Sequence, residues 1–259
     1  MTRKIEAFVF RAGTQERHAA KLRRGHDEMN RASLVMLPGL DGTGIMFRPI
    51  VDELGSEVDP IVMSYNQEGT CTYNALTDLV ADSLPQNDFF ILGESFSGPI
   101  AIKLADRKPK GLKGIILCAT FISNPSALIP AFFSFLIRAP LFYIWPVSVK
   151  AAVLTGGRAN RQIRGLIEET KRVSTSKALA CRTRQALQVN VSSELERCDY
   201  PILYLKGARD LIVGSRNLRA IKKIKENVSD VTIDSSHLVL QEAPRDAAQE
   251  ILKFIRTAT

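Results

Sequence analysis

Short apolar runs alternate with amphipathic segments along most of the chain. Residues 72–84 carry Leu76, Leu79, Val80 and Leu84 at the spacing of one helix face. The runs with the length and composition of buried strands are residues 32–37, 60–64, 88–92, 112–119, 201–205 and 228–234. Strand and helix patterns therefore alternate, which predicts an α/β fold with a mostly parallel sheet and helices on both of its faces.

The alternation is interrupted once, in the middle of the chain. Residues 122–195 hold aromatic, proline-broken and basic pieces without a strand pattern, and they predict a helical insertion. We therefore expect a core made of residues 1–121 and 196–259, which this insertion divides. Near the N-terminus, residues 5–10 alternate like an early edge strand, and residues 12–31 are polar and basic, as in a loop.

One apolar segment, residues 129–149, has about the length of a membrane span. Arg138 lies at its middle, and Pro130, Pro140 and Pro146 divide it into pieces too short to cross a bilayer. We expect no membrane span here, and instead a pair of short helices that are buried or line a cleft.

The motif Gly93-Glu94-Ser95-Phe96-Ser97-Gly98 joins a strand pattern to a helical one. A serine between small residues at such a turn has the layout of a nucleophile elbow, in which the turn exposes the hydroxyl. The usual pattern is G-x-S-x-G, whereas here Ser97 holds the second glycine position and Gly98 follows it. A G-x-S sequence is common by chance, so the interpretation depends on a base, an acid and oxyanion donors elsewhere.

His237 is the candidate base. It follows the strand pattern at residues 228–234, so it should emerge at the same edge of a parallel sheet as Ser95. The other two histidines, His18 and His26, lie upstream of every candidate partner.

Asp210 is the candidate acid, because it follows the strand pattern at residues 201–205. Its alternative role is an ordinary turn or capping aspartate. Three rival acids are less well placed: Asp199 precedes its strand, and Asp230 and Asp234 belong to the strand that leads to the histidine. With Asp210 orienting it, His237 would take the Ser95 proton during attack on an ester carbonyl.

An oxyanion needs preorganised donors. The backbone N–H of Phe96, directly after Ser95, is one candidate, and that of Leu40 in the turn Pro38-Gly39-Leu40-Asp41-Gly42-Thr43-Gly44 is the other. This turn could also be a plain glycine-rich loop. It lacks both G-x-G-x-x-G and a following G-K-[ST], which disfavours a nucleotide site.

Together the elbow, the Leu37–Gly42 turn, the segment Leu203-Tyr204-Leu205-Lys206-Gly207-Ala208-Arg209-Asp210 and the pair Ser236-His237 resemble the α/β-hydrolase superfamily. The resemblance covers about residues 32–256 and implies an α/β-hydrolase fold in which residues 122–195 form the cap. It departs at Pro38, where many members have histidine, and at Ser97. Within the superfamily the chain is similar to small cytosolic carboxylesterases, including the type that cleaves pimeloyl-carrier-protein methyl ester.

The insertion carries many large apolar residues, which as cap residues would line an acyl pocket or attach the cap to the core. The candidates for the pocket are Phe132, Phe133, Phe135, Leu136, Phe142 and Trp145. The net charge is +8, and basic residues are concentrated between residues 150 and 184. This is either a solvated helix face or a docking surface for an acidic partner such as an acyl carrier protein. The candidates for that face are Arg158, Arg161, Arg164 and Arg172.

We therefore expect a serine carboxylesterase that acts on short- to medium-chain acyl esters. The alternatives are a thioesterase or acyltransferase with the same triad, or a non-catalytic binding protein that kept the fold. No nucleic-acid-binding module accompanies the charge, so nucleic acid is not an expected partner. We expect no metal and no cofactor.

Cys71, Cys118, Cys181 and Cys198 are scattered without C-x-x-C pairing, which argues against a zinc site or a disulfide framework. This pattern favours a reducing compartment, and the N-terminus shows no apolar run of signal-peptide length. On these grounds we expect a cytoplasmic location.

Overall fold

The structure is a computed structural model that describes residues 10–11, 31–126, 130–144 and 146–258. The edge strand expected at residues 5–10 and the loop expected at residues 12–31 lie largely outside the described residues. At Phe10–Arg11 the chain forms the short strand β1.

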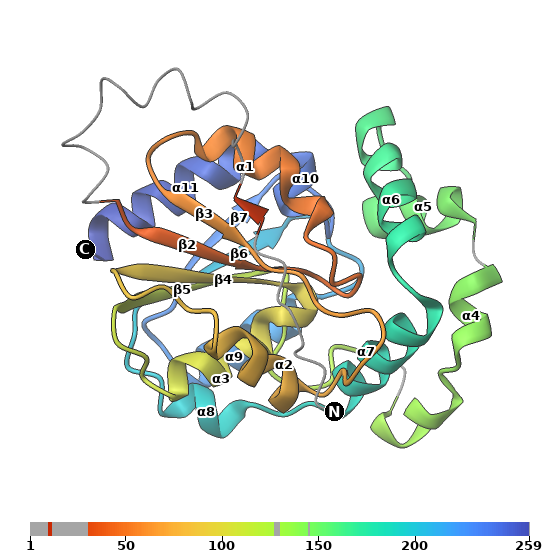
Figure 1. Ribbon diagram of the computed structural model, residues 1–259, viewed down its shortest axis with the longest axis horizontal. Helices are drawn as coiled ribbons and strands as arrows, with labels where there is room; N and C mark the ends of the chain where they lie inside the picture. The colour runs from red at the N-terminus through yellow and green to blue at the C-terminus, as the bar shows by residue number, and fades with distance from the viewer. Residues whose placement is uncertain (1–9, 12–30, 127–129, 145, 259) are drawn as a thin grey trace, which may run out of the picture.

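A seven-stranded sheet forms the centre of the molecule, in the order β1-β3-β2-β4-β5-β6-β7 (Figure 1). β1 runs antiparallel to β3, and the other neighbouring strands are parallel. The strands after β1 are β2 (Ser33–Leu37), β3 (Asp59–Val62), β4 (Phe89–Glu94), β5 (Leu112–Cys118), β6 (Ile202–Gly207) and β7 (Ser229–Ile233). The predicted mostly parallel α/β fold is confirmed.

Helices cover both faces of the sheet, so the central strands β2 and β4 are buried on both sides. Along β2, Val35 and Leu37 pack into one apolar cluster and Leu34 and Met36 into another, as the two-residue period of a strand requires. The first face is covered by α2 (Tyr73–Ala81), α3 (Gly98–Asp106), α8 (Ser192–Glu196) and α9 (Ser215–Ile224). The second is covered by α1 (Arg48–Leu54), α10 (Val239–Glu242) and α11 (Pro244–Ala258).

The insertion is helical and stands beside the sheet, on the right in Figure 1. Its elements are the 3₁₀ helix η4 (Ala131–Leu136), α4 (Ala139–Ile144), α5 (Val147–Thr155), α6 (Arg161–Val173) and α7 (Ser176–Gln188). Its two ends meet, because Ser123 pairs with Asn190 in an isolated antiparallel bridge. The division into a core and a cap at residues 122–195 remains a prediction.

One small apolar cluster joins the insertion to the rest of the molecule. Ala151 of α5 and three residues of α6 pack against Met46 and Leu238, and the three are Ile163, Leu166 and Ile167. Among the described residues, no helix combines the length and apolarity needed to cross a bilayer.

A disulfide joins Cys71, just before α2, to Cys181 on α7. The cysteine spacing, which argued against a disulfide framework, therefore did not predict this bond. The two residues are 110 positions apart and form no local spacing pattern, so only the fold brings them together. The argument from cysteines to a reducing compartment loses its basis, because disulfides are rare in reducing cytosol. Cys118 and Cys198 are free and buried.

Candidate active site

Ser95 lies in a sharp turn between β4 and α3, where its φ of 49° is in the left-handed region that non-glycine residues rarely adopt. Glycines on either side let the strand and helix approach. A Cβ on Gly93 would come 2.7 Å from the carbonyl oxygen of Ser97, and one on Gly98 would come 2.1 Å from Oγ1 of Thr120. This is the strained turn of a nucleophile elbow.

Ser97, the departure from G-x-S-x-G, is fully buried and has a defined role in packing. Its hydroxyl donates to the carbonyl oxygen of Pro38 and accepts from the Tyr65 hydroxyl at 2.6 Å. It thus joins the elbow to the turn that begins at Pro38. The position that must be glycine for the helix to pack closely is therefore Gly98, one residue later than in the usual motif.

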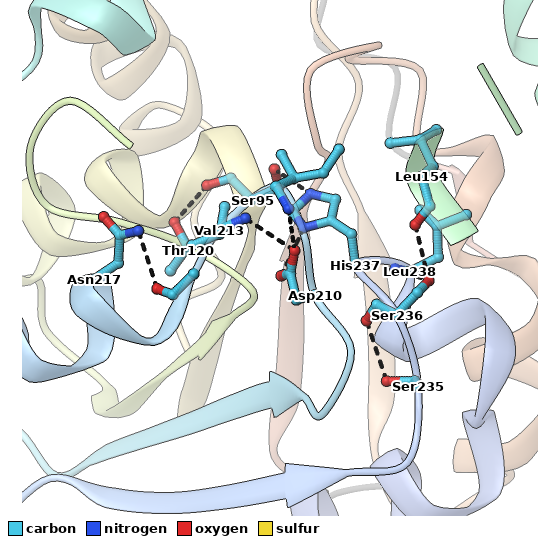
Figure 2. Close-up of polar contacts among 12 residues, drawn as sticks. Ser95, Thr120, Leu154, Asp210, Val213, Asn217, Ser235, Ser236, His237 and Leu238 are labelled. Carbon is cyan, nitrogen blue, oxygen red and sulfur yellow. Dashed lines mark hydrogen bonds and ion pairs between the residues drawn. The ribbon is translucent and has the colours of Figure 1, made fainter. Parts of the chain in front are cut away.

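The structure brings Ser95, His237 and Asp210 together, as expected (Figure 2). The Oγ of Ser95 lies 3.0 Å from Nε2 of His237, and Nδ1 of His237 lies 2.9 Å from Oδ2 of Asp210. The side chains of the histidine and the aspartate are 6% and 1% exposed, so the pair is shielded from water. With the Nδ1 proton donated to the aspartate, Nε2 is free to accept the serine proton.

Backbone contacts between the ends of β6 and β7 hold the histidine and the aspartate in place. The amides of Ala208 and Arg209 donate to the carbonyls of Ile233 and Ser235. Gly207 is required at this crossing, since a Cβ there would lie 1.9 Å from the carbonyl oxygen of Ser236. Asp210 is fixed further because its Oδ1 accepts two backbone amides, those of Ile212 and Val213, at 2.8 and 2.9 Å.

The glycine-rich turn after β2 lies directly beside the elbow. A Cβ on Gly39 would be 3.9 Å from Cβ of Ser95. Gly39, Leu40 and Ser95 line one cavity. The Phe96 ring is buried and stacks on Tyr73 at 4.8 Å, so only its backbone remains for the site. The placement suits the expected oxyanion role of the Leu40 and Phe96 amides, which remains a prediction.

Arg182, on α7 of the insertion, is hydrogen-bonded to the backbone of the turn after β2. Its Nη1 donates to the carbonyls of Leu40 and Asp41 at 3.1 and 2.7 Å, and its Nη2 donates to that of Asn66 at 3.0 Å. The side chain is fully buried, and its guanidinium lies 5.5 Å from the Tyr65 ring centroid. The sequence showed Arg182 only as one of many basic residues. No local signal distinguishes it from the exposed basic residues of the insertion, such as Arg172 and Lys177.

Glu94 is a second polar residue that the motif alone did not identify as part of the site. Its carboxyl group is buried, accepts from Nε2 of Gln241 at 2.9 Å and receives a hydrogen bond from the Gly39 amide. Burial raises its pKa to about 7, while these two donors and nearby His237 lower it, and Asp41 raises it. A neutral acid is therefore substantially populated beside the triad at neutral pH.

A cavity of about 380 Å³ opens onto Ser95 and His237. This volume lies in the range of small-molecule sites. Most of its wall is apolar and is contributed jointly by the core and the insertion: Leu40, Met46, Phe142, Val153, Leu154, Ile167, Leu179, Ile212 and Leu238. Figure 2 shows one link between the two parts, in which the Ser236 hydroxyl lies 2.8 Å from the Leu154 carbonyl oxygen.

Of the aromatic pocket candidates, Phe142 lines the cavity. The prediction is wrong for Phe132, Phe135 and Leu136, which are 77%, 55% and 58% exposed and lie outside the cavity lining. Their 3₁₀ helix places one residue in three on its inner face, and that face is taken by buried Ser134, which accepts from Gln188 at 2.7 Å. The Phe133 side chain and Trp145 lie outside the described residues.

The four arginines proposed for a docking face are exposed, at or near α6. They are Arg158, Arg161, Arg164 and Arg172. The opposite face of α6 is buried, so this helix separates the basic surface from the cavity. Within the described residues, no group of three or more histidine, cysteine, aspartate and glutamate side chains is placed to hold a metal ion.

Comparison with solved structures shows the same fold in several enzymes at low sequence identity. An esterase from Thermogutta terrifontis is 20% identical, with a TM-score of 0.74 over 88% of this chain and 90% of that one. A hydrolase from Pseudomonas aeruginosa is 19% identical, with a TM-score of 0.73 over 87% and 90%. An enol-lactonase from Burkholderia xenovorans is 17% identical, with a TM-score of 0.72 over 90% and 94%. A search of curated proteins found no match.

The sequence also matches the family described as serine aminopeptidase, S33, over residues 72–237. This range is more than half of the chain and extends from the start of α2 to the histidine. Fold, elbow and family match agree: the chain belongs to this family of α/β-hydrolases and is a serine hydrolase.

Proposed function

We propose that the protein hydrolyses carboxylic esters with an apolar acyl chain, using Ser95 as nucleophile, His237 as general base and Asp210 as the residue that orients the histidine. The observation that carries this proposal is the hydrogen-bonded chain from Ser95 through His237 to Asp210 at the wall of a mostly apolar cavity. Esterases among the structural neighbours are consistent with it.

In this mechanism His237 takes the Ser95 proton as Oγ attacks the ester carbonyl carbon. The backbone N–H groups of Leu40 and Phe96 donate hydrogen bonds to the carbonyl oxygen as negative charge develops on it. His237 then returns the proton to the leaving alcohol, and an acyl-enzyme remains on Ser95. Water, deprotonated by His237, releases the acid and restores the serine.

The first experiment measures turnover of p-nitrophenyl butyrate by wild-type protein and by Ser95→Ala. The variant should lose at least 1,000-fold in kcat, since the nucleophile is absent. Labelling of the wild type, but not of the variant, by a fluorophosphonate checks the nucleophile independently. An unchanged rate in Ser95→Ala would contradict the assignment.

A panel of acyl acceptors and leaving groups separates related activities on the same triad. An amino-acid p-nitroanilide tests for aminopeptidase activity, an acyl thioester tests for thioesterase activity, and an added alcohol tests for acyl transfer. The proposal requires that the ester with water as acceptor gives the highest kcat/KM.

We further propose that the acyl chain is delivered on an acyl carrier protein, as in a carrier-linked pimeloyl methyl ester. The support is the position of Arg158, Arg161, Arg164 and Arg172, which are exposed around a helix whose inner face borders the cavity. A carrier protein is acidic, so opposite charges would guide its approach.

Reversing two of these charges in Arg161→Glu/Arg164→Glu tests the carrier proposal. We expect kcat/KM for an acyl-carrier-protein ester to fall about tenfold and to become less sensitive to salt. Turnover of p-nitrophenyl butyrate should stay unchanged. Equal rates of wild type and variant on the carrier-linked ester would contradict docking at this face.

A further inference from the structure

Two lysines of the insertion lie in the cavity wall. Lys150 is on α5 and Lys171 is in the last turn of α6, and both border the same cavity as Ser95. Lys150 is half-buried, whereas Lys171 is exposed. The pKa of Lys150 is lowered, first by burial and then by the charge of Lys171, so the two ammonium groups are close enough to repel each other.

Neither lysine makes an ion pair with an acid in the described part of the chain. Glu168, three residues before Lys171 on α6, is exposed and lies outside the cavity lining. Three other nearby acids have partners of their own. Glu169 pairs with Arg48, Asp41 accepts from the Thr43 amide, and Glu94 is buried against Gly39 and Gln241. Two lysines thus border a mostly apolar cavity, and neither has an ion-pair partner within the described residues.

We propose that Lys150 and Lys171 form a subsite for an anionic group, a carboxylate or a phosphate, carried by the substrate at a distance from its ester. An apolar part of the substrate would lie against Val153, Leu154 and Ile167, which belong to the same two helices. The anion would relieve the repulsion between the lysines and supply the missing counter-ion. This inference rests on the proposed function, because it describes the specificity of the same site.

Matched ester pairs test the subsite. Mono-p-nitrophenyl adipate and p-nitrophenyl hexanoate differ in whether the six-carbon acyl chain ends in a carboxylate or a methyl group. A hexanoyl ester of glycerol 3-phosphate and the corresponding ester of glycerol differ in a phosphate on the alcohol side. We expect kcat/KM to favour the charged member of one pair by about tenfold at low salt. The pair that shows the preference identifies whether a carboxylate or a phosphate is bound.

The variants are Lys150→Met, Lys171→Met and the double variant, which keep much of the apolar length of each side chain. The double variant should lose most of the preference, chiefly through KM. Lys177→Met is the matched control, because Lys177 is exposed on α7 and lies outside the cavity lining, and it should retain the preference.

The subsite is contradicted if the wild type prefers neither charged ester, or if the double variant slows both members of each pair equally. Failure of the proposed function gives a different result: the wild type would turn over none of the four esters and would not react with a fluorophosphonate. Circular dichroism and the melting temperature of each variant establish that a lost preference is not a folding defect.

Discussion

The two walls of the cavity are built on different physical principles. The polar wall consists of the turn at residues 39–41 together with Glu94. Arg182 donates to this turn, and the Cys71–Cys181 disulfide anchors the same helix, α7, one residue before Arg182. The apolar wall consists of Phe142, Val153, Leu154 and Ile167, from helices α4 to α6. Hydrogen bonds hold the polar wall in a fixed geometry, whereas the apolar wall is held by non-directional packing of side chains.

This difference matches what each wall must do. Oxyanion donors have to be in position before charge develops, so small displacements are costly. An acyl chain needs only an apolar surface of the right size, and non-directional packing supplies it. One helix of the insertion, α7, supports the polar wall through Arg182 and also contributes Leu179 to the cavity lining, whereas α4, α5 and α6 contribute to the apolar wall. We expect damage to the polar wall to affect kcat or folding, and damage to the apolar wall to affect KM.

Two arginines on α7 allow the walls to be compared directly. Arg182 donates to three carbonyls of the polar side, whereas Arg184, two residues on, donates to the Ile137 carbonyl at 2.8 Å, near α4. Arg182→Met removes the support of the Leu40 peptide and should lower kcat by roughly 1,000-fold, the upper range for loss of an oxyanion donor. Steady-state kinetics on p-nitrophenyl butyrate measures it.

Arg184→Met is the matched control and should change kcat less than threefold. Arg182→Lys should recover part of the lost rate, because an ammonium group can replace some of the donors. Arg182 is a positioning residue, so the decisive measurement is the split between kcat and KM. Equal losses in Arg182→Met and Arg184→Met would mean that α7 only stabilises the fold.

The disulfide should contribute to stability through the same helix. It closes a loop of 110 residues, for which we expect a contribution of about 4–5 kcal/mol to the free energy of unfolding. Urea unfolding of the wild type with and without dithiothreitol should show this difference, and Cys71→Ser/Cys181→Ser should show none. Thiol titration of the unfolded, unreduced protein should find two thiols, those of Cys118 and Cys198. Four thiols would contradict the disulfide.

Glu94 makes the stability of the polar wall depend on pH. Its pKa is raised from an ordinary value of 4.5 to about 7 in the folded protein, so the folded state binds the proton more tightly than the unfolded state. The stabilisation is present below pH 4.5 and is lost as the pH rises through 7. The shift corresponds to about 3 kcal/mol.

Glu94→Gln should remove this dependence, because an amide does not ionise. The measurement is the difference in unfolding free energy between wild type and Glu94→Gln at several pH values from 4.5 to 8.5. The groups facing Glu94 are His237, Asp41, Gln241 and the Gly39 amide, and all of them remain in the variant. A difference that stays constant over this range would show that Glu94 keeps an ordinary pKa.

Parts of the polar wall follow from local sequence patterns, and other parts depend on contacts between distant residues. The sheet could be predicted because buried parallel strands are continuous apolar runs. Ser95, Asp210 and His237 could be brought together because each follows such a run, and parallel strands end at one edge. Arg182 and the disulfide could not be found in this way. Their partners lie over 100 residues away, and neither makes a local pattern.

The apolar wall illustrates a different limit: the phenylalanines are evident in the sequence, but the sequence does not show which of them face the cavity. An excess of phenylalanine predicted a pocket, but composition does not tell which side of a helix each ring occupies. Burial of Ser134 turns Phe132 and Phe135 outward, where their rings contact each other edge to face at 5.9 Å. Phe142, a few residues on, does reach the cavity.

Substituting Phe135 and Phe142 in turn tests which of these phenylalanines contacts the substrate. Phe135→Ser should change the free energy of unfolding by about 0.5 kcal/mol or less and leave KM for p-nitrophenyl hexanoate unchanged, because the ring is 55% exposed and outside the cavity. Phe142→Ser, the matched variant, removes apolar surface from the cavity and should raise that KM several-fold with little change in kcat. The KM and kcat of both variants are measured in the same series of initial rates. If Phe135→Ser raises KM as much as Phe142→Ser, the outer phenylalanines fold onto bound substrate, and the apolar wall extends beyond the cavity.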